Sequence, residues 1–523
     1  MKNGFRQSMA WLHTWVGLIL GWLIFAIFVM GTVSYFKDEI SQWMQPETQF
    51  AVPAPTQSAH TGLVAMQRLA PNAQVWGINL PNARAPVLDI YWQEPSGGYQ
   101  QALLNPLTGE KVVARESLGG DFFYRFHYQL YGLPAPFGSL FVGIAAMFML
   151  LALISGVITH KKIFKDFFTF RPHKGQRSWL DFHNLAGVVA LPFFLMITYT
   201  GLAIFFYLYM PFGLLARYGS EAGKFYDEIQ QSAAVVKVTT TPRAMPMQDW
   251  NGLIAQAAGT WQAGEPIGSI EVTKPNTDQA VVTFTRQAGA MLNARFGASQ
   301  SFNAVTGARL PNQRNNDAVA QTGGVIYGLH EAHFASLPLR WGLFGSGLLG
   351  CAMVATGLIL WTVKRRRQTD KAGQVSVGHY LVERLNIAAI VGLPLAIGAY
   401  LTANRLLPVE IAGRSDMEVR AFFIVWFAAL LYASLRSWRQ GWRELTVLLA
   451  LLYLALPVIN AVVMPSDALP STLLQGKTVL AAMDLTLWGF GLFFACVGYR
   501  LWRPKPAQRH LTKKHHGVRS EAL

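Results

Sequence analysis

Cysteine, charge and nucleotide-binding motifs are scarce in this chain, and each scarcity excludes a class of chemistry. Only Cys351 and Cys496 occur among 523 residues, which excludes a disulfide framework. C-x-x-C-H and C-x-x-C are absent, which excludes a c-type haem and argues against iron–sulfur and zinc sites. We find no acid–base or nucleophilic apparatus and no nucleotide fingerprint, because the G-x-G-x-x-G at residues 345–350 lies inside an apolar span and not between a strand and a helix. Any haem in this protein is therefore b-type, held by axial ligands alone.

Charged residues make up only 14% of the chain, whereas 52% is hydrophobic and the mean hydropathy is +0.26. This composition is typical of a polytopic membrane protein. Most of the apolar segments reach the ~20 residues that cross a bilayer. Eight spans are predicted, at residues 11–35, 138–160, 182–210, 340–363, 380–403, 420–436, 444–464 and 477–501.

The net charge of +16 is concentrated after the even-numbered spans. Lys161 and Lys162 follow the second span, Arg365 and Arg366 follow the fourth, and Arg439 lies between the sixth and the seventh. This is the positive-inside pattern of a bacterial inner membrane, and it predicts that both termini are cytoplasmic. Because the charges are explained in this way, we expect no nucleic-acid partner.

Two long polar stretches, 37–125 and 211–335, lie opposite the basic clusters and are predicted to be periplasmic. Each has the pattern of a short helix followed by strands, the last expected strand of the second stretch being MLNARFG. The strands end alike, since Asn105-Pro-Leu-Thr-Gly in the first stretch recurs as Asn303-Ala-Val-Thr-Gly in the second. A Thr-Gly turn is ordinary by itself, but its recurrence at the same place indicates a tandem duplication of span, domain and span.

The predicted fold is a polytopic α-helical membrane protein with about eight spans and two periplasmic α+β domains inserted in a duplicated core. The two copies share one orientation, so an axis along the membrane normal relates them. The expected segments are a first transmembrane helix (1–36), periplasmic domain 1 (37–125), transmembrane helices 2 and 3 (126–210), periplasmic domain 2 (211–335), transmembrane helix 4 (336–365), a C-terminal four-helix bundle (366–503) and a basic cytoplasmic tail (504–523).

Four histidines repeat with the duplication. His13 and His183 open equivalent spans of the two copies, and His127 and His330 precede the other two equivalent spans. Neutral imidazole is a preferred ligand of haem iron. Because the pseudo-two-fold axis brings equivalent residues face to face, His13 with His183 and His127 with His330 are candidate axial pairs. Two imidazoles fill both axial positions, which favours electron transfer over oxygen chemistry.

Other residues compete for these roles. His160 ends the second span at the depth of His13, and His333 lies one helical turn after His330. Either is an alternative ligand or a hydrogen-bond partner near a haem. Arg125 and Arg177 are candidates for binding haem propionates, although anchoring of helix ends to lipid phosphates explains them equally well. Asp484 lies inside the last span and is either a functional acid or a hydrogen-bond partner of a neighbouring helix.

Four motifs carry a resemblance to a known family. They are His13-x-Trp15-x-Gly17, Thr159-His-Lys-Lys-Ile-Phe-Lys-Asp-Phe-Phe-Thr-Phe-Arg171, Arg177-Ser-Trp-Leu-Asp-Phe-His-Asn184 and Leu329-His330. Over residues 1–365 the chain resembles the PepSY-associated transmembrane protein family, which is linked to bacterial iron uptake and includes dihaem ferric-siderophore reductases of the inner membrane. The resemblance implies that the polar stretches are PepSY modules. The C-terminal bundle lies outside it.

The resemblance implies an oxidoreductase with two haems b per chain. It would carry electrons from a cytoplasmic reductase or a quinol to a ferric siderophore in the periplasm, releasing Fe(II). Two alternatives stay open on the sequence. One is a membrane-anchored PepSY regulator or sensor without redox activity. The other is an iron or siderophore transporter that uses the last four spans and Asp484.

Overall fold

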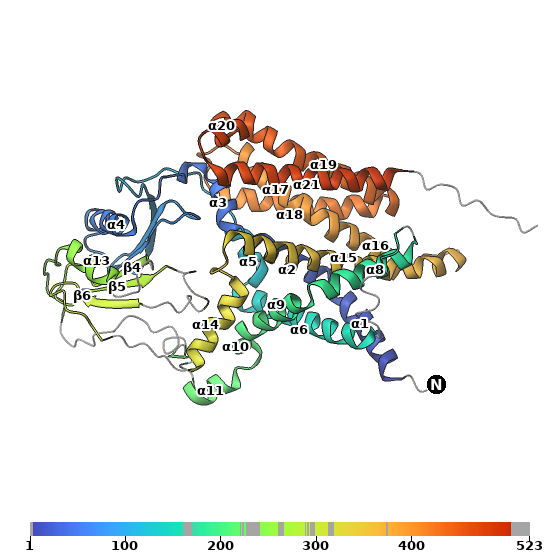
Figure 1. Cartoon of the computed structure of the whole chain (residues 1–523), viewed down its shortest axis with the longest axis horizontal. Coiled ribbons are helices and arrows are strands. Elements are labelled where there is room, and N and C mark those ends of the chain that lie inside the picture. The colour runs from blue at the N-terminus through green and yellow to red at the C-terminus, as the bar shows by residue number, and fades with distance from the viewer. Residues whose placement is uncertain are drawn as a thin grey trace, which may run out of the picture.

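The protein is described from a computed structural model (Figure 1). The structure describes most of the chain, and the statements below concern the described residues. The residues left out are 1–3, 161–169, 173, 220, 222–223, 226–240, 260–265, 288, 290–291, 293–298, 312–317, 373–374 and 504–523. Lys161, Lys162 and most of the strand expected at 291–297 therefore lie outside the described residues.

Among the described residues, six segments are long and apolar enough to cross a membrane, or up to eight if each of two bent helix pairs is one span, against the eight that the sequence predicts. Six are helices or continuous helix pairs, whereas two are pairs bent by 66°. The six are α6 (Ala135–Thr159), α15 (Leu337–Ala372), α16 (Val377–Ile387) joined to α17 (Leu393–Leu406) through a π-helical turn, α18 (Arg414–Leu435), α19 (Trp438–Val463) and α21 (Thr478–Trp502). The bent pairs are α1 (Phe5–Ile19) with α2 (Gly21–Ser34), and α8 (Gln176–Val189) with α9 (Leu191–Ile204).

The two bends are a feature of the duplication that sequence patterning did not reveal. They fall at Leu20 and Ala190, which are equivalent positions of the two copies. Each bend redirects one half of the span, so that α1 packs along α6 and α8 packs along α15. The halves before the bends carry His13 and His183.

The two polar stretches form one antiparallel sheet. Its strands are β1 (Val75–Asn79), β2 (Leu88–Gln93), β3 (Tyr99–Leu104), β4 (Ile267–Thr273), β5 (Val281–Arg286) and β6 (Ser299–Asn303), in the order β3-β2-β1-β4-β5-β6. The strands β1 and β4, one from each stretch, pair in the middle with Ile78 opposite Ile270. The sequence suggested two separate domains, but edge strands with unpaired amides and carbonyls favour pairing, and here they join the modules.

The repeated turn has the same geometry in both modules. The Asn105 side chain accepts a hydrogen bond from the Leu107 amide, and Asn303 does the same for Val305, both at 2.9 Å. Gly109 and Gly307 then adopt positive φ of 69° and 71°, which favours glycine. The duplication inferred from the sequence is therefore visible in backbone detail.

One face of the sheet is covered by α4 (Pro55–Leu69) and α13 (Trp250–Ala258), as Figure 1 shows. We call this end of the molecule the sheet end, and the opposite end, where α1 and α16 begin, the distal end. The remaining short helices gather toward the sheet end. They are α3 (Lys37–Met44), η1 (Pro46–Thr48), α5 (Asp121–Gln129), α10 (Phe206–Tyr209), α11 (Phe212–Tyr218), α14 (Ala318–Glu331), η4 (Pro465–Asp467) and α20 (Leu469–Leu474).

The last four spans form a bundle that packs against the duplicated core. The largest buried cluster lies at this contact and includes Trp43, Phe122, Tyr400 and Phe422. Helix α5 is embedded in it, with the Phe122 ring 4.9 Å from Tyr400 and 5.0 Å from Phe422, centre to centre. The C-terminal bundle thereby supports the helix that carries His127.

Candidate functional site

The four repeated histidines meet as two facing pairs. His13 on α1 faces His183 on α8, with ring centres 6.1 Å apart and planes at 69°. His127 on α5 faces His330 on α14, with ring centres 5.9 Å apart and planes at 28°. The first pair lies toward the distal end and the second toward the sheet end. These are the pairings that the duplication predicts.

Backbone carbonyls orient the histidine rings. Nδ1 of His13, His127 and His183 lies 2.9 Å from the carbonyl oxygens of Ala152, Ile27 and Met353, in that order. A carbonyl oxygen only accepts, so Nδ1 carries the proton in each neutral ring. The lone pair is then on Nε2, which is free to bind a metal.

His330 is oriented in a related way. Its Nδ1 lies 3.0 Å from Oγ1 of Thr200, and the ring also forms a hydrogen bond with the backbone of Ile197. The Thr200 hydroxyl donates to the Met196 carbonyl at 2.7 Å, so its oxygen is available to accept from His330. Among the described residues no hydrogen bond reaches Nε2 of any of the four histidines.

Each ring also rests against a glycine of the neighbouring helix. A Cβ at that glycine would come within 2.6–3.2 Å of the ring, closer than or at the lower limit of ordinary contact. The glycines are Gly156 for His13, Gly31 for His127, Gly357 for His183 and Gly201 for His330. Each lies four residues after the carbonyl that holds the ring, so one helical turn supplies both the acceptor and the space.

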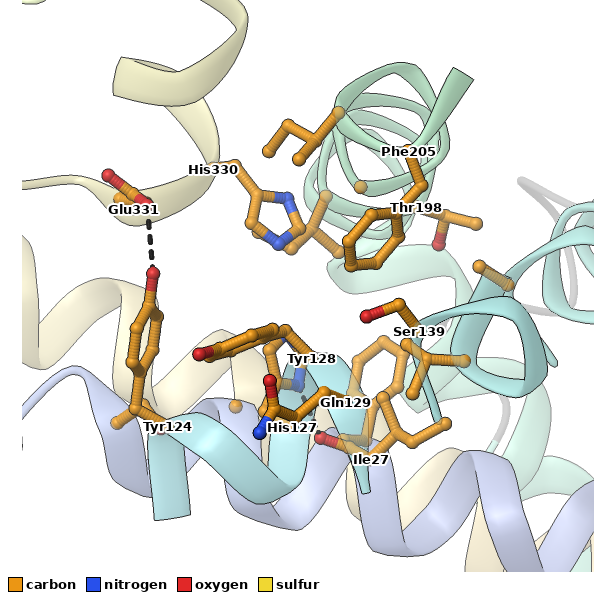
Figure 2. A pocket seen from close by; sticks show the side chains of 18 of the residues that line it. Ile27, Tyr124, His127, Tyr128, Gln129, Ser139, Thr198, Phe205, His330 and Glu331 are labelled. Atoms are coloured by element: carbon orange, nitrogen blue, oxygen red, sulfur yellow. Dashed lines mark hydrogen bonds between the residues drawn. The ribbon is translucent and has the colours of Figure 1, made fainter. Parts of the chain in front are cut away.

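Cavities open beside both pairs. The cavity at the sheet end has a volume of about 600 Å³, and Figure 2 shows His127 and His330 directed into it from opposite sides. The distal cavity, at His13 and His183, is larger, at about 990 Å³. Ile24 and Met149 line both cavities, so a single layer of side chains separates them.

The residues fit a haem at each pair. Two metal–imidazole bonds of about 2 Å, with ring centres about 1 Å behind the nitrogens, place the centres about 6 Å apart, close to the observed 6.1 and 5.9 Å. Within the described residues no group of three or more His, Cys, Asp or Glu is placed to hold a metal ion by itself. The histidine pairs match a metal whose remaining ligands come from a macrocycle.

The two alternative histidines line the cavities without forming a pair. His160 lies in the wall of the distal cavity, where its Nε2 is 3.0 Å from Nδ2 of Asn184. His333 lies at the sheet-end cavity with its Nε2 3.3 Å from Glu331. His160 and His333 therefore lie near the paired histidines, but neither is placed as an opposed ligand.

The arginines proposed for propionates are placed elsewhere. Arg125 and Arg177 are both exposed, and neither lines either of the two cavities described above. The distal cavity instead contains the basic side chains of Arg6, Lys364 and Arg365. The bend between α1 and α2 and the packing of α15 decide which basic side chains reach the cavity.

Two parts of the site escaped the sequence analysis. Gly31 was not singled out, although Gly31 and Gly201 are equivalent positions of the two copies, as His13 and His183 are. The Tyr124 hydroxyl, at the sheet-end cavity, donates a hydrogen bond of 3.1 Å to Glu331 (Figure 2). Tyr124 and Glu331 lie far apart along the chain, so only the fold joins them.

Asp484 is held in place by two hydrogen bonds from other side chains. It accepts hydrogen bonds from Nε1 of Trp43 at 2.9 Å and from Nδ2 of Asn460 at 3.2 Å. Trp43 lies on α3, so the carboxylate ties the C-terminal bundle to the segment that leads into the sheet. The hydrogen-bonding interpretation of this buried acid therefore accounts for both of its oxygens.

Comparison with known proteins agrees with the histidine motifs and the architecture. The sequence profile of the PepSY-associated TM region matches residues 10–364. An uncharacterised protein of Pseudomonas aeruginosa is 25% identical over 429 residues, which cover 76% of this chain and 99% of the relative. The chain is therefore a membrane protein that belongs to the PepSY-associated TM family.

Proposed function

We propose that the protein is an inner-membrane electron carrier that binds two haems b and reduces ferric siderophores on the periplasmic side. The observation that carries this proposal is the fourfold repetition of one arrangement: a histidine, a carbonyl on its Nδ1 and a glycine under its ring. A histidine with a purely structural role needs only one contact of this kind, such as the hydrogen bond to a carbonyl. Four of them, facing in pairs across cavities, meet the requirement for axial ligands.

Each histidine pair would hold a different haem. His13 and His183 would hold the haem at the distal end, and His127 and His330 the one at the sheet end. When bound, such a group supplies one-electron transfer without an open coordination site. Ile24 and Met149 are 4% exposed each and fill the wall between the cavities, so they exclude water while keeping the two sites close.

The sheet end is the proposed side of substrate reduction. Its cavity is lined by Lys37, Tyr124, Tyr128 and Glu331 beyond the histidines, a polar and aromatic mouth beneath the sheet. Siderophores bind iron through hard oxygen ligands that hold Fe(III) more tightly than Fe(II), so one electron releases the metal. We place this mouth in the periplasm because Arg365, Arg366 and Arg439 of the basic clusters lie toward the distal end.

A haem assay with ligand variants tests the proposal. We expect a pyridine haemochrome ratio near two haems per chain in protein made with ample haem. His330→Ala should remove one haem and stop siderophore reduction, while the other haem still accepts electrons. His13→Ala should remove the other haem and leave one that dithionite reduces and a ferric siderophore reoxidises. A ratio near zero in the wild type would contradict the proposal, as would full siderophore reduction by His330→Ala.

A further inference from the structure

A buried histidine outside the two pairs packs against Trp361, a residue of the distal cavity's wall, without lining the cavity itself. His379, in the first turn of α16, is 4% exposed. Its ring is stacked on Trp361 of α15, with centres 6.1 Å apart and planes at 22°. Trp361 also lines the distal cavity. One indole therefore connects His379 with the site of His13 and His183.

The hydrogen bonds of His379 fix its tautomer. Nε2 lies 3.0 Å from Oε1 of Glu383, and the same carboxylate binds the Arg366 guanidinium. An ion-paired carboxylate only accepts, so Nε2 carries the proton and Nδ1 is an acceptor. Nδ1 is buried and has no hydrogen-bond partner in the described part of the chain. A buried acceptor without a partner is destabilising, and a ligand with an O–H group would satisfy it.

A second unpartnered group lies on the same indole. Nε1 of Trp361 is buried and, among the described residues, donates to nothing. Together the two groups suit a ligand that donates a hydrogen bond to Nδ1 of His379 and accepts one from Nε1 of Trp361. A phenolic hydroxyl does both, whereas carboxylate and phosphate groups have no hydrogen to donate to Nδ1. An ionised propionate or phosphate oxygen is therefore not the partner of the histidine.

The distal cavity has room for a second molecule that arrives from lipid. Its volume is about 990 Å³ against about 600 Å³ at the sheet end, although matched histidine pairs would hold equal cofactors. Its wall includes Trp11 and Trp15, which are 65% and 37% exposed on the surface of α1. Exposed aromatic side chains on a membrane helix are typical of its interfacial region, where a lipid-soluble ligand enters.

We propose that a membrane hydroquinone is the electron donor and is oxidised beside Trp361, with His379 accepting its proton. This inference rests on the proposed function, because it names the donor for the same redox site. Both O–H bonds of the hydroquinone break, and the product is the quinone. Two electrons leave singly to the site between His13 and His183. One proton passes to Nδ1 of His379, where Glu383 stabilises the imidazolium, and the other passes to water at the membrane surface. Each electron reduces one ferric chelate at the sheet end.

The test uses the full chain with haem in lipid nanodiscs and decylubiquinol as the probe. Anaerobic mixing is followed by the absorbance of reduced haem, and dithionite gives the full amplitude. In His379→Gln the side-chain amide can still donate to Glu383. No acceptor remains at the position of Nδ1. We expect the rate with decylubiquinol to fall about tenfold or more, as for one lost hydrogen bond in a buried site, with the dithionite spectrum unchanged. His60→Gln, on α4 of the sheet domain, makes the same change elsewhere and should keep the wild-type rate.

A binding measurement gives a readout that does not depend on turnover. Quenching of 2-heptyl-4-hydroxyquinoline N-oxide fluorescence should show wild-type binding that oxidised decylubiquinone displaces, and about tenfold weaker binding to His379→Gln. Equal rates or equal affinities in wild type and His379→Gln would overturn the inference. If the variant does not assemble, wild-type protein that neither binds the quinoline nor accepts electrons from decylubiquinol would overturn it. In that case full reduction by dithionite leaves the proposed function standing, whereas a missing haem band overturns the proposed function itself.

Discussion

At the residue scale, the candidate site is defined by what surrounds each imidazole more than by the imidazole itself. A histidine near a membrane surface is most often structural. Here the carbonyl on Nδ1 leaves Nε2 as the only lone pair, and the glycine lets the ring approach the neighbouring helix. Because the same helical turn supplies both features, a substitution at the glycine disturbs the ligand while the histidine itself stays unchanged.

We predict that Gly31→Val displaces His127. A Cβ at this position would lie 2.6 Å from Cε1 and Nδ1 of the ring, so the bond to the Ile27 carbonyl cannot persist. The haemochrome ratio should fall from two toward one, and the haem that remains should be the distal one. Gly345→Val on α15 is the matched control, since no atom lies within 4 Å of its added Cβ. Retention of two haems in Gly31→Val would contradict this role of the glycine.

At the element scale, short helices and bent spans aim the histidines. Helices α5 and α14 end before the long helices α6 and α15 begin, and Leu130 and Ala332 adopt positive φ of 53° and 52° after them. Pro134 and Pro338 lie where α6 and α15 begin, and proline there disfavours one continuous helix. The break frees α5 and α14 to turn across the sheet end, so that their histidines face each other.

Helix α5 depends on the C-terminal bundle. The Phe422 side chain is fully buried and contacts Phe122 and Phe126 of α5, with ring centres 5.0 and 6.1 Å apart. Two polar contacts add to this, since Tyr400 donates to the Gly119 carbonyl at 2.9 Å and Ser117 donates to Glu418 at 2.6 Å. The bundle therefore acts as a support for His127.

We predict that Phe422→Ala destabilises the protein by about 3 kcal/mol through the cavity it leaves. The loss should be felt first at α5, so the sheet-end haem should be lost or shift its midpoint potential while the distal haem keeps its own. Redox titration followed by absorbance separates the two. Phe493→Ala on α21 is the control, because that ring is 59% exposed. Equal shifts of both haems would show that the bundle supports the core as a whole.

At the scale of the whole molecule, duplication produces two sites and one shared domain. The pairing of β1 with β4 joins the two modules at the sheet end, while α2 packs on α15 and α6 packs on α9 to join the spans of the two copies. A ligand pair needs one residue from each copy. The joined sheet therefore helps to keep the two copies in the relative position that the histidine pairs require.

We predict that the sheet lies outside the cytoplasm and the C-terminal tail inside it. In spheroplasts, cysteine at Ser96, in the turn between β2 and β3, should react with an impermeant maleimide, whereas cysteine at Ser520 should react only after lysis. Cys496 is exposed, so it should first be replaced by serine. The reverse labelling pattern would invert the direction of electron flow that we propose.

The sequence by itself determined the periodic features of this protein. Span positions follow from runs of apolar residues, and the duplication follows from matched motifs such as the Thr-Gly turns. The histidine pairs follow from the duplication, because a pseudo-two-fold axis brings equivalent positions together. These features are local or recur at equivalent places in two copies, so they can be recognised without knowing the fold.

Only the tertiary structure decided what depends on contacts between distant segments. The 66° bends at Leu20 and Ala190 have no marker in hydropathy, yet they determine that Arg6 and Arg365 reach the distal cavity and that Arg177 does not. The joined sheet, the hydrogen bonds of Asp484 and the buried Nδ1 of His379 likewise arise from packing. The physical reason is that a side chain's partner is set by where helices cross in space, and crossing is a property of the packed molecule.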